Sequence, residues 1–228
     1  MTTSAADGGV PWWTLRRAIG RAPATSLLLL TLLVTTATLA GSGAHVVRWL
    51  VKGASTNLHN MTWHPVYVLL VSPFWVQSVR WIVPVALLTV AVMGPAERVL
   101  GTRTTLLIFA AGHVGATLVT VGAIDVGVSR GWLPHSLAFA ADVGPSYGLA
   151  ALAGVLTFRL RPGLVRRIGL TMLMVALGVA AVVGADFTDA GHLAAAVLGL
   201  VIASRLTGVQ RHATTQGSVN LVSSSPRR

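Results

Sequence analysis

Residues 104–122 read TTLLIFAAGHVGATLVTVG, a run of 19 positions that contains no acidic residue, lysine or arginine. A bilayer core of roughly 30 Å needs about 20 apolar residues in one helix. By this length criterion six segments are candidate transmembrane helices, at about 24–43, 78–95, 104–122, 144–160, 167–185 and 190–205. None shows the polar alternation of an outer-membrane strand, and helices satisfy their own backbone hydrogen bonds in lipid. The sequence therefore predicts an all-α, polytopic membrane protein with six transmembrane helices.

The overall composition agrees with this fold class. Of the 228 residues, 54% are hydrophobic and only 10% are charged, whereas soluble domains carry about 25% charged residues. The chain has no cysteine. Disulfides and thiolate chemistry are therefore excluded, and cysteine usage says nothing about the redox compartment.

The net charge of +11 is better explained by membrane topology than by nucleic-acid binding. In the six-helix arrangement, thirteen arginines fall on one side: Arg16, Arg17, Arg21, Arg98, Arg103, Arg159, Arg161, Arg166, Arg167, Arg205, Arg211, Arg227 and Arg228. Four basic residues fall on the other: Arg48, Lys52, Arg80 and Arg130. Cytoplasmic loops are enriched in lysine and arginine. We therefore predict an integral protein of a bacterial-type plasma membrane, with both termini cytoplasmic, basic loops attracted to anionic lipid and no nucleic-acid partner.

Segments of different composition flank the predicted membrane domain at 24–205. Residues 1–23 are predicted to be a cytoplasmic segment with the interfacial aromatics Trp12 and Trp13. The alternative for this end is a signal peptide cleaved near the small residues 39–44. Residues 206–228 form a basic tail rich in Ser, Thr, Gln and Gly without an apolar face, and are predicted to be disordered.

A long external loop is predicted at about 45–77, between the first two helices. Its many aromatic residues favour short helices that lie in the membrane interface. Such a loop is either a passive amphipathic belt or a wall of a functional site. His59 and His64 have no third ligand at a recognisable spacing, so no metal or cofactor is predicted.

A serine and a histidine stand at matched depths in two of the predicted helices. Ser146 lies in Asp142-Val-Gly-Pro-Ser-Tyr-Gly148, at the start of the fourth helix, and His192 lies at the start of the sixth. Both helices run inward from the external face, so the two side chains can meet if the helices pack closely. Small residues at close spacing provide for this contact: Gly191, Ala195, Gly199 and Ala203 on the sixth helix, and Gly144, Gly148, Ala151 and Gly154 on the fourth.

This pair suits nucleophilic catalysis. Pro145 is favoured at a first helical position, which leaves the backbone N–H groups of Ser146 and Tyr147 free to stabilise an oxyanion. A serine hydroxyl needs a nearby base, and His192 is placed to serve as one. The alternative is structural: a helix-start serine is often a cap, and an intramembrane histidine often bonds to a neighbouring backbone.

Two other ionisable groups are given structural roles. His113 lies in the middle of the third helix and is predicted to pack with a hydrogen-bonded ring. Asp189 precedes the sixth helix and is interpreted as its cap rather than as a group that orients His192.

The order of these features resembles the rhomboid family of intramembrane serine proteases. The resemblance runs over residues 24–205, through the loop at 64–74, the turn from Gly94 to Gly101 that contains Glu97, the Gly144-Pro-Ser146 motif, and His192 with Gly199 seven positions on. It implies a six-helix bundle in which Glu97, Gly101, Gly144 and Gly199 are structural. It also implies a Ser146–His192 dyad, without an acidic third member, that cleaves transmembrane segments of client proteins near their external ends.

The chain also departs from the family pattern. Trp81 and Val85 stand where many rhomboids have the histidine and asparagine that help to bind the oxyanion. Tyr147 replaces the glycine after the serine, and Ala150 replaces the tyrosine that usually supports the histidine ring. Two kinds of group are candidates to compensate for the missing donors: the backbone N–H groups at the start of the fourth helix, or a loop residue such as Asn60 or His64. These departures keep a second hypothesis open, a catalytically inactive rhomboid-like protein that binds membrane clients.

Overall fold

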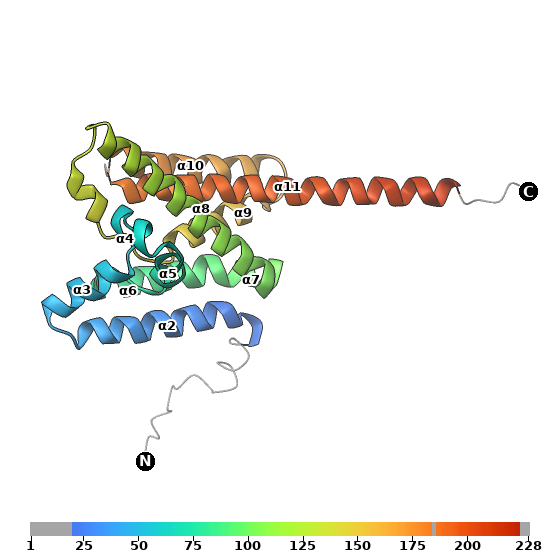
Figure 1. Cartoon of the computed structure of the whole chain (residues 1–228). Coiled ribbons are helices and arrows are strands. Elements are labelled where there is room, and N and C mark those ends of the chain that lie inside the picture. The colour runs from blue at the N-terminus through green and yellow to red at the C-terminus, as the bar shows by residue number, and fades with distance from the viewer. Residues whose placement is uncertain (1–19, 184–185, 224–228) are drawn as a thin grey trace, which may run out of the picture.

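The chain folds into a bundle of helices (Figure 1). The computed structural model describes residues 20–183 and 186–223, and the predicted interfacial Trp12 and Trp13 lie outside this range. The first half comprises α2 (Pro23–Ala40), α3 (Ala44–Ala54), α4 (Leu58–Trp63), α5 (Pro65–Val71), η1 (Ser72–Phe74), η2 (Val79–Trp81), α6 (Ile82–Leu88), the π-helical η3 (Thr89–Met93) and α7 (Gly94–Leu100). The second half comprises α8 (Thr102–Ser129), η4 (His135–Phe139), α9 (Ser146–Phe158), α10 (Leu164–Val183) and α11 (Phe187–Ser223). The all-α membrane bundle predicted from the sequence is confirmed.

Five stretches of the described residues are long and apolar enough to cross a bilayer. They are α2, the continuous run Val79–Leu100, α8, α10 and the first part of α11, Phe187–Leu206. The fourth predicted helix is shorter than expected, because α9 has only 13 residues. At 1.5 Å per residue it measures about 20 Å, less than the roughly 30 Å of a bilayer core. One end of α9 must therefore lie below the membrane surface if its other end reaches the opposite interface.

Helix α9 is the centre of the bundle, as its burial shows. Leu149, Ala151, Leu152 and Val155 are each at most 1% exposed. The close packing of α9 against α11 that the small residues predict is confirmed, since a Cβ on Gly199 would overlap the backbone of Ala151. Gly148, in contrast, faces α8, where a Cβ would collide with the Phe109 ring. A glycine at each of these two contacts lets α9 pack closely against both α8 and α11.

Glu97 ties three helices together at one end of the bundle. Its carboxylate accepts hydrogen bonds from the backbone N–H groups of Ala24 and Thr25, both at 2.9 Å, and from the Thr25 hydroxyl at 2.7 Å. Thr102, at the start of α8, donates a fourth hydrogen bond at 2.8 Å. The N–H groups of a first helical turn have no partner within their own helix. A carboxylate in the first turn of α7 therefore caps α2, which lies more than seventy residues earlier in the chain.

The start of α2 and the far end of α11 lie at the same end of the bundle, and α3, α4 and η4 lie at the other (Figure 1). Helix α11 continues to Ser223, which differs from the disordered tail predicted from residue 206. No proline interrupts the chain between Phe187 and Ser223. The residues after 206 lack an apolar face, but each can still extend the helix by one backbone hydrogen bond.

Candidate active site

A cavity of about 330 Å³ brings together the predicted site residues. It lies between the stretch that leads into α6, the start of α9 and the start of α11. Its lining residues are Val76, Gln77, Trp81, Pro84, Val85, Leu88, Val143, Gly144, Pro145, Ser146, Asp186, Thr188, Asp189 and His192. Ser146 and His192 therefore share one cavity, although they are separated by more than forty residues in the sequence.

The loop before α9 determines where Ser146 lies. Gly144 has a φ of 133°, a conformation that side-chain-bearing residues rarely adopt. Its N–H donates to the Ser72 carbonyl at 2.9 Å, which fixes the turn against η1. Helix α9 begins at Ser146, with Pro145 as its N-cap. The backbone N–H groups of Ser146 and Tyr147 are consequently in the first turn, where they have no acceptor within the helix.

His192 is held from one side by an acid on its own helix. Its Nδ1 lies 3.7 Å from Oδ1 of Asp189, one turn earlier on α11. Its Nε2 is buried and has no hydrogen-bond partner among the described residues. The interpretation of Asp189 as the cap is wrong, because Asp189 lies within the first turn of α11. Asp186 takes the capping position instead, since its Oδ1 accepts from the N–H and the hydroxyl of Thr188, both at 3.2 Å.

Tyr147 holds His192 from the other side. The two rings meet edge to face, with centroids 5.3 Å apart and an interplanar angle of 70°. Gly191 makes room for this contact, since a Cβ there would lie 2.5 Å from the Tyr147 hydroxyl oxygen. The usual ring support from position 150 is absent because that residue is alanine, and Tyr147 contacts the histidine ring instead. The residue directly after the serine supplies an aromatic ring from a different turn of the helix.

Tyr147 is in turn fixed by Asp142. Its hydroxyl donates to Oδ2 of Asp142 at 3.1 Å, and the Thr56 hydroxyl donates to the same oxygen at 3.3 Å. The Asp142 N–H donates to the Ser55 hydroxyl at 2.7 Å. Burial raises the pKa of Asp142 from 3.8 to about 6, and the bonds from Tyr147 and Thr56 partly oppose this rise. The end of α3 is thus connected through Asp142 and Tyr147 to His192.

The cavity contains two of the four positions at which the chain departs from the rhomboid pattern. Trp81 and Val85 line it together with Ser146, and neither is the histidine or asparagine donor of the family. The proposed substitutes are elsewhere: Asn60 uses both its amide hydrogens on the carbonyls of Lys52 and Ser55, and neither Asn60 nor His64 lines the cavity. Sequence reasoning missed Gln77, which does line it and whose amide donates to the Ala141 carbonyl at 3.1 Å.

A second serine–histidine pair is entirely internal. Ser72 Oγ lies 3.0 Å from His113 Nε2, so the predicted hydrogen bond of the His113 ring is present. Ser72 is 0% exposed and His113 is 3% exposed. Since the Ser72 carbonyl also accepts from Gly144, this pair joins α8 to the loop before α9. A short serine–histidine distance alone therefore does not identify a reactive serine in this fold.

The comparisons with known proteins bear on the same residues. The family model described as "Rhomboid-like protein" matches residues 17–212. The chain belongs to the rhomboid-like family. The match covers the predicted membrane domain at 24–205 and includes both Ser146 and His192. No curated protein and no solved structure matches the chain significantly. Within the described part of this rhomboid-like protein, no group of three or more His, Asp or Glu side chains could hold a metal ion.

Proposed function

We propose that this integral membrane protein is an intramembrane serine protease that cleaves transmembrane segments of other membrane proteins near their external ends. Ser146 is the nucleophile and His192 is the general base. The observation that carries the proposal is the cavity that Ser146 and His192 both line, in which Nδ1 of the histidine faces Asp189 and its buried Nε2 has no hydrogen-bond partner in the described part of the chain. Serine hydrolases likewise hold one ring nitrogen of the histidine on an acid and use the other as the base toward the serine.

The reaction proceeds by acyl transfer. Ser146 Oγ attacks the scissile carbonyl carbon while Nε2 of His192 takes the hydroxyl proton. The tetrahedral intermediate collapses when the same nitrogen returns that proton to the leaving amine. Water then attacks the acyl-enzyme with His192 again as the base, which releases the carboxylate and restores the serine. The backbone N–H groups of Ser146 and Tyr147 stabilise the oxyanion, and the Gln77 amide, at the rim of the cavity, supplies a further donor.

The shape of the site favours a helical, membrane-embedded client. Trp81, Pro84, Val85 and Leu88 give the cavity an apolar wall on the side of α6. Because α9 is about 20 Å long, Ser146 lies below one membrane surface when Arg159 lies at the other. The excess of arginines on one side of the predicted helices supports a site near the external surface and cytoplasmic termini, and we propose a bacterial-type plasma membrane as the location.

One observation favours a second candidate, an inactive rhomboid-like protein that binds membrane clients without cleaving them. Trp81 and Val85 occupy the cavity where donors would be needed, and Nε2 of His192 makes no hydrogen bond to Ser146. Loss of one oxyanion donor typically lowers the rate by about 10²- to 10³-fold. A slow protease and an inactive binder therefore have to be distinguished by a chemical test of the reactivity of Ser146.

A fluorophosphonate probe separates the two candidates. We expect it to label the wild-type protein in membranes and to fail on Ser146→Ala. Ser72→Ala is the matched control, because Ser72 is also within reach of a histidine but has no exposed surface, and this variant should be labelled as wild type. Absence of labelling in a folded wild-type sample, or equal labelling of wild type and Ser146→Ala, would favour the inactive binder.

A further inference from the structure

A second cavity, of about 430 Å³, lies between α3, α4 and η4 and shares no lining residue with the Ser146–His192 cavity. Four of its lining side chains are basic, namely His45, Arg48, Lys52 and His59. No acidic residue lines it, and Trp49 and Phe139 add aromatic surface. The cavity therefore has the basic lining that is typical of an anion site. It lies in a part of the protein that the proposed protease activity does not use.

The position of these cations is unusual for a membrane protein. Only four lysines and arginines fall on the side predicted to be external, and Arg48 and Lys52 are two of them. External loops are generally poor in such residues. The two cations are four positions apart on α3 and so lie on one face of the helix. Val47 and Val51, on another face, pack into the core, which directs the basic face away from the bundle.

Contacts within the protein hold the wall of the cavity in place. The Asn60 side-chain amide donates to the carbonyls of Lys52 and Ser55, at 2.7 and 2.8 Å, and so holds α4 against the end of α3. The His59 ring packs on Phe139 with centroids 5.1 Å apart. A preformed wall lowers the ordering cost that binding would otherwise incur.

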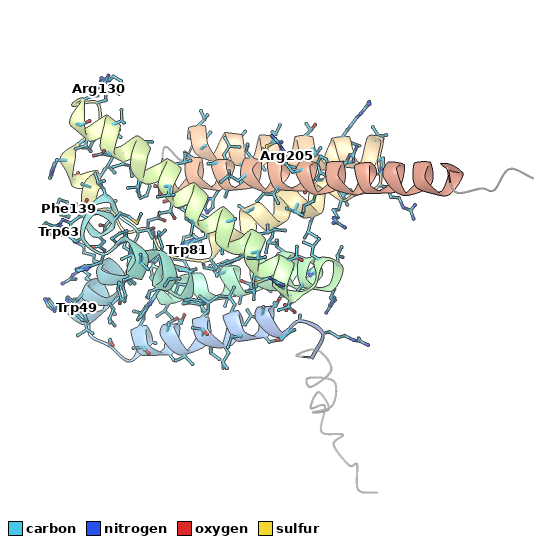
Figure 2. All side chains as sticks on the ribbon, turned by 45° about the vertical axis from the view of Figure 1, so that its right-hand side comes forward. Trp49, Trp63, Trp81, Arg130, Phe139 and Arg205 are labelled. Carbon is cyan, nitrogen blue, oxygen red and sulfur yellow. The ribbon has the colours of Figure 1, made fainter. Side chains whose placement is uncertain are left out.

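The cavity lies among exposed aromatic side chains. Trp49 is 70% exposed and Trp63 is 69% exposed. Figure 2 shows both at the same end of the bundle as Phe139. Tryptophan prefers the headgroup level of a bilayer, which is also the level of lipid phosphates. A phosphate at this depth would meet Arg48 and Lys52, and both side chains bind phosphate through charge-assisted hydrogen bonds.

We propose that this cavity binds the phosphate of an anionic phospholipid headgroup, with Arg48 and Lys52 as its ligands. The exposed indoles of Trp49 and Trp63 favour a lipid over an acidic segment of a client protein, because they place the mouth of the cavity in the bilayer interface. The site is independent of catalysis, so binding can be measured whether or not Ser146 is reactive.

Native mass spectrometry of the detergent-solubilised full chain tests the proposal. Phosphatidylglycerol and phosphatidylcholine are added separately, and the dissociation constant of the first retained lipid is measured. Wild type should prefer phosphatidylglycerol, and R48Q/K52Q should bind it roughly thirty-fold more weakly, since each cation near a lipid surface contributes about a factor of five. The matched control is R80Q/R130Q, which removes the other two external charges; these arginines lie over Trp81 and Trp132 instead.

Several results would overturn the proposal. They are equal affinity of wild type for the two lipids, an equal loss of affinity in both double variants, displacement of the lipid by an acidic peptide at comparable concentration, and binding of inorganic phosphate without any lipid preference. Melting temperatures establish that the variants fold. If R48Q/K52Q does not fold, the single variants R48Q and K52Q replace it, each with an expected loss of about five-fold.

Discussion

Asp189→Asn gives the most direct test of the proposed role of His192 as a base that Asp189 supports. If Asp189 holds Nδ1, the variant leaves the ring without its negatively charged neighbour when Nε2 takes the serine proton. Two unit charges at the observed 3.7 Å attract by about 4 kcal/mol at an effective dielectric of 20 and by about 1 kcal/mol in water. The side chains are 23% and 29% exposed, so an intermediate value of about 2 kcal/mol applies. The labelling rate should therefore fall roughly thirty-fold.

Asp186→Asn is the matched control for this experiment. It removes the same charge from the same cavity, while the amide oxygen of asparagine can still accept the hydrogen bonds from Thr188. The assay is the second-order rate constant for fluorophosphonate labelling of purified protein, measured for wild type and both variants. We expect Asp186→Asn to lose less than about three-fold, because the charge of Asp186 acts on the His192 ring more weakly than that of Asp189. An unchanged rate in Asp189→Asn, or equal losses in both variants, would refute a positioning role for Asp189.

Three further predictions concern stability, each read from thermal unfolding in detergent. Gly199→Ala should lower the free energy of unfolding by about 1–3 kcal/mol, because the added Cβ would overlap the α9 backbone. The control is Gly178→Ala, which should be neutral or slightly stabilising because nothing lies within 4 Å of its Cβ. Equal effects of the two substitutions would contradict the close packing of α9 and α11. Glu97→Gln should lower the free energy of unfolding by about 1.5–3 kcal/mol, because it weakens the cap of α2. The control Asp125→Asn, at an exposed position, should lower it by less than about 0.5 kcal/mol. Burial raises the pKa of Asp142 to about 6. The free energy of unfolding of wild type should therefore fall by about 2 kcal/mol as the pH rises from 4 to 6, and Asp142→Asn should not show this fall. A pH profile identical in both proteins would contradict the assigned burial.

The sequence predicted the bundle well because its signals are local and strong. Long apolar runs with arginines clustered at one set of ends leave few alternatives to a polytopic helical fold. Small residues on the fourth and sixth helices also indicated the contact that brings Ser146 and His192 to one cavity. The length of α9 was less predictable, since the predicted segment at 144–160 includes Gly144 and Pro145, which form the turn before the helix.

The details around His192 could not be predicted in the same way. The sequence places Asp189 three residues before the histidine, but both a cap and an orienting acid fit that spacing. The Tyr147 ring reaches His192 only because Gly191 leaves space on the facing helix. Gln77 lies in an irregular stretch between η1 and η2, where no helical period relates it to Ser146.

The sequence by itself determined the six apolar segments, their orientation signal and the pair of helices that carry the serine and the histidine. These properties depend on hydrophobicity and on the helical period, which operate within a few residues. Only the tertiary structure decided that Asp189 faces Nδ1, that Tyr147 supports the ring, and that Asn60 belongs to the wall of a different cavity. Such contacts depend on the rotation and offset of packed helices and on the path of loops. Those are set by packing across the whole bundle rather than by neighbours along the chain.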